Sequence, residues 1–108
     1  MNTCEWSKRA ETELAKCAKY CVLTFGKKIA HKFVDSINHH AQLLSNNPHL
    51  GATERLLTDR KREYRSIVVH EYFKLIYFHN EKKSIIYIVD LWDTRREPRK
   101  LSQRVRSK

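Results

Sequence analysis

Cysteine is scarce in this chain of 108 residues, and its three positions, Cys4, Cys17 and Cys21, include no Cys-x-x-Cys pair. An odd, unpaired set indicates neither a disulfide framework nor a zinc site. Cys17 and Cys21 lie four residues apart and, with His31, offer metal ligands in principle, but thiols at this spacing more often pack as small apolar residues. The six histidines include no His-Glu-x-x-His spacing, so we expect no metal and no cofactor.

Long apolar runs are also missing. No stretch approaches the roughly 20 residues that cross a bilayer, and the N-terminus lacks the charged start, apolar middle and cleavage site of a signal peptide. We therefore expect a cytoplasmic protein that makes no use of a membrane. Hydrophobic residues make up 41% of the chain, which together with the length predicts one core and one domain.

Acidic residues are few beside basic ones: 12 Asp and Glu face 22 Lys and Arg, which gives a net charge of +10. The excess is concentrated in residues 95–108, where seven cations accompany Glu97 alone. Such a field attracts nucleic acid, an acidic protein or anionic lipid, although a solvated tail that aids solubility explains the same charge. We assign residues 1–101 to the folded domain and residues 102–108 to a basic C-terminal tail.

Two amphipathic helices are expected in the N-terminal half. Ser7 is a good N-cap, apolar residues then recur at helical spacing as far as Phe25, and Gly26 supplies a left-handed stop. A second apolar stripe runs from residue 29 to residue 44 and ends at Asn46-Asn47-Pro48. The short connection predicts an antiparallel helical hairpin.

The pattern then changes to strands. Residues 64–70, 73–79 and 84–92 are rich in Val, Ile, Tyr and Phe, and short linkers join them. Short linkers predict an antiparallel meander, preceded by an extended segment at residues 2–6. The fold class is therefore α+β, with the N-terminal helical hairpin packed on a small, mostly antiparallel sheet.

One cation stands out within the strands. Lys74 interrupts the apolar-aromatic run from Tyr72 to Phe78, so it must face water or a partner. If Arg65, Lys74 and Arg95 share one side, they form a basic surface edged by aromatic rings such as Trp92, which suits a phosphodiester backbone with stacked bases. Ordinary pairing with Glu63 or Asp90 explains the same residues.

The order of these segments resembles the RelE/ParE superfamily of bacterial toxins, the toxin halves of type II toxin–antitoxin systems. The similarity spans nearly the whole chain, through the segments Glu5–Ala10, Asn47–Gly51, Tyr64–Arg65, Phe73–Tyr77 and Ile88–Pro98. It implies a small sheet packed on a helical hairpin, and a cognate antitoxin whose acidic or amphipathic tail holds the toxin inactive. It does not imply one activity, because some members cleave messenger RNA on the ribosome and others poison DNA gyrase.

The resemblance to the nuclease branch implies a metal-independent endoribonuclease. Glu54 matches the position of the general base, while Arg65 and Lys74, together with Arg95 or Arg96, match cations that stabilise the charged phosphate. The sequence departs from that branch in two ways. No Tyr or His follows the last strand as proton donor, and Ile67 stands where a second lysine is expected.

The gyrase-poison branch requires only a stable scaffold and a basic C-terminal segment, and the segment from Asp93 to Lys100 resembles it at least as well. In either case Arg96, Arg99, Lys100 and Trp92 are candidates for binding phosphate or nucleic acid. We take the ribosome-dependent nuclease, with ribosome and mRNA as partners, as the first hypothesis. The gyrase poison is the alternative, and an inactive orphan that only binds protein is a further one.

Overall fold

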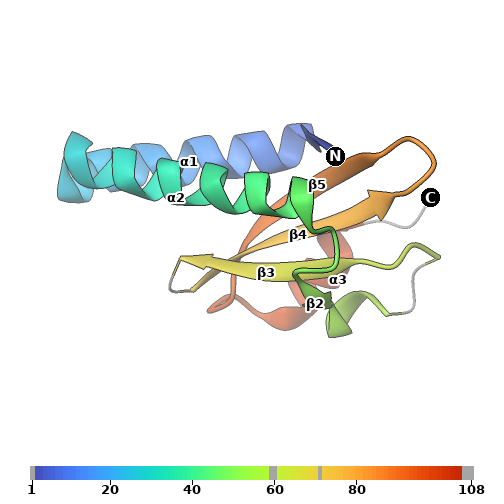
Figure 1. The fold of residues 1–108 in the computed structure, drawn as a ribbon. Coiled ribbons are helices and arrows are strands. Elements are labelled where there is room, and N and C mark those ends of the chain that lie inside the picture. Colours follow the sequence, from blue (N-terminus) through green and yellow to red (C-terminus); the bar gives the residue numbers. More distant parts are fainter. Residues whose placement is uncertain (1, 59–60, 71, 106–108) are drawn as a thin grey trace.

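The computed structural model describes residues 2–58, 61–70 and 72–105 of the chain. The elements follow in the order β1 (Thr3–Trp6), α1 (Lys8–Phe25), α2 (Lys27–Asn46), β2 (Ala52–Thr53), the 3₁₀ turn η1 (Arg55–Leu57), β3 (Arg65–His70), β4 (Phe73–Asn80), β5 (Ile85–Asp93) and α3 (Pro98–Arg104). Figure 1 shows the α1–α2 hairpin lying along one face of the sheet and α3 on the opposite face. The predicted α+β class is confirmed.

The helical hairpin begins and turns where the sequence predicts. The Ser7 side chain accepts a hydrogen bond from the Ala10 backbone N–H at 3.0 Å and so caps α1. Gly26 separates the two helices with φ +92°, a conformation that a residue with a side chain rarely adopts. Beyond the sheet the hairpin projects into solvent (Figure 1), and Tyr20, Leu23 and Phe25 are exposed there.

The sheet has five strands in the order β1-β5-β4-β3-β2. The three central strands form the predicted antiparallel meander. The extended segment at the N-terminus pairs as β1 in parallel with β5 but ends opposite Ile88, so the last residues of β5 have no strand on that side. This short β1 leaves part of the β5 edge open to side chains from α1 and α3.

Each face of the sheet packs against its own core. The helical hairpin covers the first core, in which Ile37 and Leu44 of α2 meet Leu75, Tyr77 and strand residues near them. The second core lies on the opposite face and consists of Leu57, Tyr64, Ile76, Trp92, Leu101 and Val105. Burial of a Leu or Val side chain contributes about 1.5–3 kcal/mol, so this second core holds α3 on the sheet.

The structure therefore places part of the expected tail within the fold. The boundary predicted after Leu101 falls inside α3, and Val105 is buried. Residues 102–105, which the sequence assigns to the basic tail, thus complete α3 and its packing, because the apolar side chains at 101 and 105 share one helical face. The rest of that tail, residues 106–108, lies outside the described residues.

The three thiols pack against the first core, as predicted. The Cys4 thiol donates a hydrogen bond to the Ala41 carbonyl at 3.2 Å. Burial raises the pKa of Cys17 to about 11, with a further contribution from Glu13, so this thiol is not activated as a nucleophile. Within the described residues there is no group of His, Cys, Asp and Glu side chains arranged to hold a metal ion.

Candidate functional site

The segment between α2 and β3 is held against the sheet by its backbone. The Gly51 backbone N–H donates to the Tyr77 hydroxyl at 2.9 Å, and this hydroxyl donates in turn to the Pro48 carbonyl at 2.8 Å. A β-carbon at Gly51 would lie only 2.5 Å from the Ser66 carbonyl oxygen, so no side chain fits there. This close approach brings Glu54 over the sheet.

Glu54, the predicted general base, is buried and accepts three hydrogen bonds. It caps η1 by accepting from the Leu56 backbone N–H at 3.1 Å, and it also accepts from the Ser66 hydroxyl at 3.1 Å and from the Lys74 ammonium. Burial alone would raise the pKa of Glu54, but the Lys74 hydrogen bond and charge, with the other two donors, hold it below the usual value. The carboxylate is ionised and fully engaged.

Lys74 and Arg65 lie on opposite faces of the sheet, which corrects the expectation that they share one. Lys74 is opposite Val68 in the β3–β4 register and Arg65 is opposite Tyr77, and Lys74 and Tyr77 are three positions apart along β4. Because side chains alternate between faces along a strand, an odd separation places them on different sides. The shared phosphate site predicted from these two cations is not formed.

Arg65 is occupied by local partners. One guanidinium nitrogen donates to the Gly51 carbonyl at 2.8 Å, and the other forms an ion pair with Glu63 at 2.8 Å. This is one of the ordinary pairings that the sequence left open. Arg65 thus fixes the turn before β2.

Arg95 lies two residues beyond the end of β5 and does not contact Glu54 through any hydrogen bond or ion pair of the described residues. Its guanidinium donates to both carboxylate oxygens of Asp93, at 3.0 and 2.8 Å, and lies 4.5 Å from the centre of the Tyr72 ring. These hydrogen bonds lower the pKa of Asp93 and raise that of Arg95. Arg95 also lines a groove of about 460 Å³ between the hairpin and the sheet, where Tyr20 and Phe25 supply apolar walls.

Trp92 does not offer its ring to a base, contrary to our expectation. It is 1% exposed and forms part of the second core, because its register position opposite Lys74 directs it beneath α3. The guanidinium groups of Arg96 and Arg104 lie 5.1 and 5.0 Å from the ring centre. Trp92 therefore orients two arginines, a cation–π arrangement that stabilises each by roughly 0.5–2 kcal/mol.

The other two predicted nucleic-acid contacts, Arg99 and Lys100, both belong to α3 and are exposed. Arg99 forms an ion pair with Glu97 at 3.2 Å. Lys100 instead lines a hollow with Arg9, Arg96, Gln103 and Arg104. Although they are adjacent in sequence, Arg99 is thus paired with a carboxylate while Lys100 faces a basic hollow.

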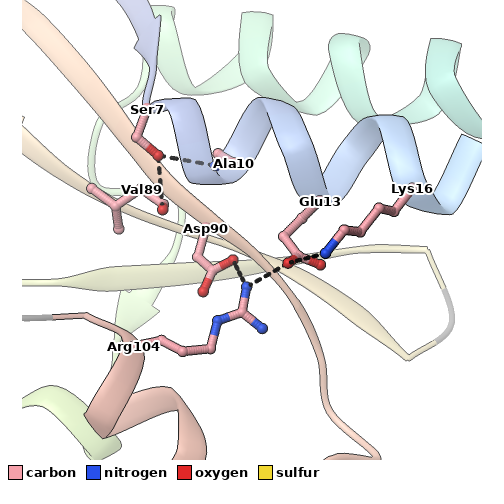
Figure 2. Close-up of polar contacts among 7 residues, drawn as sticks. All are labelled: Ser7, Ala10, Glu13, Lys16, Val89, Asp90 and Arg104. Atoms are coloured by element: carbon pink, nitrogen blue, oxygen red, sulfur yellow. Dashed lines mark hydrogen bonds and ion pairs between the residues drawn. The ribbon is translucent and has the colours of Figure 1, made fainter.

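The sequence alone did not reveal a buried ionic cluster at the open edge of β5 (Figure 2). One nitrogen of Arg104 donates to Asp90 at 2.7 Å and lies 3.2 Å from Glu13 of α1. Burial raises the pKa of Asp90 to about 6; Arg104 and Arg9 act to lower it, and Glu13 acts to raise it. The sequence shows Asp90 as a charged residue within an apolar strand. Its partner Arg104 is 14 residues away, in the segment predicted to be the basic tail.

Comparison with known proteins places the chain in a family. The sequence model of a family described as the ParE toxin of the type II toxin–antitoxin system parDE matches residues 4–98. Comparison with curated proteins finds no match.

Among solved structures, one described as the chromosomal ParDE toxin–antitoxin system from P. aeruginosa is similar in fold. Its TM-score is 0.67 at 18% sequence identity, and the alignment covers 84% of this chain and 94% of that one. In the part of the chain that the structure describes, no helix is long and apolar enough to cross a membrane. Because the family match spans most of the sequence, this protein belongs to the ParE toxin family of type II toxin–antitoxin systems.

Proposed function

We propose that this toxin arrests growth by poisoning DNA gyrase and does not cleave RNA. The observation that carries the proposal is the state of Glu54, which is buried, ionised and hydrogen-bonded to Lys74, Ser66 and the Leu56 backbone. A general base needs an accessible oxygen and a pKa near the working pH. Glu54 meets neither requirement. Its side chain is only 4% exposed, and its pKa is held below the usual value.

The cations of the nuclease hypothesis also fail to converge. Lys74 neutralises Glu54, Arg65 is bound to Gly51 and Glu63 on the other face, and Arg95 is bound to Asp93. Stabilising a pentacoordinate phosphate requires donors aimed at one point. Membership of the ParE family and the missing proton donor after β5 favour the gyrase alternative on independent grounds.

In this proposal the chain is a binding protein whose target is gyrase and whose neutralising partner is a cognate antitoxin. It needs a rigid scaffold, and Glu54, Lys74 and Arg65 supply that rigidity. The Glu54–Lys74 pair ties η1 to β4, and Arg65 ties the turn at Gly51 to β3. Residues 94–100, which follow β5, are exposed and carry four cations that a partner can reach.

Two parallel assays with the purified protein test the proposal. In the first, gyrase supercoils plasmid DNA in the presence of the toxin, and we expect loss of supercoiling with accumulation of cleaved DNA. In the second, ribosomes carrying a defined message are incubated with the toxin and mapped by primer extension, and we expect intact message. Cleaved message together with unaffected gyrase would overturn the proposal and restore the nuclease hypothesis.

A further inference from the structure

A hollow of about 420 Å³ lies between α1 and α3 and is lined by Arg9, Arg96, Lys100, Gln103 and Arg104. Four of these five side chains are cationic, and the fifth is an amide that donates hydrogen bonds. The space is much larger than the ~30 Å³ that a water molecule occupies in the liquid. The hollow therefore combines the room and the donors that an anionic group requires.

The spacing of the residues explains how α3 builds one wall. Lys100, Gln103 and Arg104 are three and four positions apart, so they lie on one face of the helix. Arg96 lies four residues before Lys100, in the loop that precedes α3. Its guanidinium packs on the Trp92 ring, and this contact orients the side chain. Arg9 reaches the same hollow from the first turn of α1, about 90 residues away in sequence.

The cations that line the hollow differ in whether a carboxylate pairs with them. Arg104 is engaged by Asp90 and Glu13, yet its Nε is buried and has no hydrogen-bond partner among the described residues (Figure 2). Within residues 2–58, 61–70 and 72–105, no carboxylate forms an ion pair with Arg9, Arg96 or Lys100.

Nearby cations outside the hollow behave differently. Arg95 and Arg99 each form an ion pair with a carboxylate two residues earlier. Arg9, Arg96 and Lys100 are thus available to a ligand in the hollow, while Arg104 beside them is held by two carboxylates.

We propose that this hollow, formed by Arg9, Arg96, Lys100, Gln103 and Arg104, binds phosphate groups of a DNA backbone. Arg96 and Lys100 meet phosphate oxygens from α3 and the loop before it, and Arg9 meets them from α1. Arg104, held by Asp90 and Glu13, keeps the two helices in place around the ligand. The choice of duplex DNA as the polyanion rests on the proposed action on gyrase, whose substrate is DNA.

The test measures binding of the full-length toxin to a fluorescent 20-base-pair duplex over a range of salt concentrations, without gyrase. Each phosphate contact contributes about −0.9 to the slope of log affinity against log salt. We expect Arg96→Gln/Lys100→Gln to reduce the magnitude of this slope by about two. At 0.1 M salt the same loss corresponds to a weakening on the order of 50- to 100-fold.

A second variant tests the site from another element. Arg9→Gln leaves α3 untouched, and we expect it to reduce the slope by about one. The charge-preserving variant Arg96→Lys/Lys100→Arg should retain most of the affinity. The thermal unfolding midpoint of every variant is measured as well, to establish that each variant is folded when its DNA binding is compared.

The matched control is Lys82→Gln/Lys83→Gln, which removes two exposed charges from the β4–β5 turn at the other end of the sheet. An equal loss of affinity in this control would show general attraction and overturn the site. Undetectable binding by the folded natural protein at 50 mM salt would overturn it too, as would displacement of the duplex by polyglutamate at equal charge concentration. If the natural toxin bound DNA as expected but did not inhibit gyrase, the proposed function would be refuted and the DNA-binding site would stand.

Discussion

At the scale of single residues, the most informative side chain is Glu54, where donors from three segments meet on one carboxylate. The Leu56 backbone comes from η1, the Ser66 hydroxyl from β3 and the Lys74 ammonium from β4. A buried acid that stays ionised needs this full set of donors. Glu54 therefore belongs to the framework of the protein and holds η1 on the sheet.

Replacing Glu54 by Gln tests this structural role. The variant leaves the Lys74 ammonium, which is 17% exposed, without its counter-charge, so we expect the free energy of unfolding to fall by about 1–3 kcal/mol. Adding Lys74→Met removes the charge that has lost its partner, so it should restore part of the lost stability. The effects of the two substitutions on the unfolding free energy are not additive, because the two residues are in contact. Urea unfolding of the two single variants and the double variant measures the coupling.

Activity separates this role from general-base chemistry. Where the Glu54→Gln variant is folded, its inhibition of gyrase should match that of the natural protein. A fall in growth arrest of more than about 100-fold with unfolding energy unchanged would instead identify Glu54 as a base, because a positioned base contributes 10²- to 10⁴-fold.

The sequence identified these residues but not their arrangement. It singled out Lys74 because a cation in an apolar strand needs a partner, and the structure supplies one. Which face each cation occupies depends on strand register, which residue spacing alone does not give for residues on different strands. For this reason the sequence alone suggests one site for Arg65 and Lys74, whereas the register places them on opposite faces.

At the scale of elements, the helical hairpin and the meander were predictable because local signals define them. Ser7 and Gly26 mark the ends of α1 through capping and a left-handed turn, and both effects act within a few residues. Helix α3 carries only a weak local signal, since most of its residues are charged or polar. Its formation depends on Leu101, which packs on Trp92 and other distant residues of the second core.

The pairing of Asp90 with Arg104 links α3 to the sheet. Burial of the Asp90 carboxyl at this link raises its pKa and makes the stability of the protein depend on pH. The pKa of Asp90 rises from 3.8 to about 6 on folding, so the folded state binds its proton more tightly than the unfolded chain does. The stability gained from this carboxyl is complete below pH 3.8 and is lost as the pH rises through about 6.

We expect Asp90→Asn, which cannot titrate, to be more stable relative to the natural protein at pH 7.0 than at pH 4.5. The difference in unfolding free energy between variant and parent should shift by on the order of 1–2 kcal/mol between these two pH values. Urea unfolding at both values measures it. Other titrating groups, such as Glu54 and Asp93, are common to both proteins and cancel in the comparison.

The exposed Asp35→Asn on α2 makes the same chemical change away from the cluster. This variant measures how removal of an exposed carboxyl alone changes the unfolding free energy at the two pH values. Should Asp90→Asn behave like this control, the Asp90 carboxyl would not be titrating between pH 4 and 6, and the ionic cluster would not couple α3 to pH.

At the scale of the whole molecule, charge and architecture act together. The chain carries a net charge of +10 on a body whose two cores lie on opposite faces of one five-stranded sheet. The hairpin leaves apolar side chains exposed at its tip, and cations of α3 and of the loop before it line a hollow beside α1. A protein with such a field associates rapidly with acidic or phosphate-bearing partners.

We expect expression of this chain without an antitoxin to arrest bacterial growth, and co-expression of its cognate antitoxin, sought in the adjacent short gene, to restore it. Because the proposed target is gyrase, a DNA-damage reporter should rise before the rate of protein synthesis falls. Leu101→Asp places a charge in the second core and should unfold the toxin, so this variant serves as the inactive control. Normal growth with confirmed folded toxin would contradict an active poison and leave a protein that only binds its partner, while an immediate fall in protein synthesis before any DNA damage would point to the ribosome.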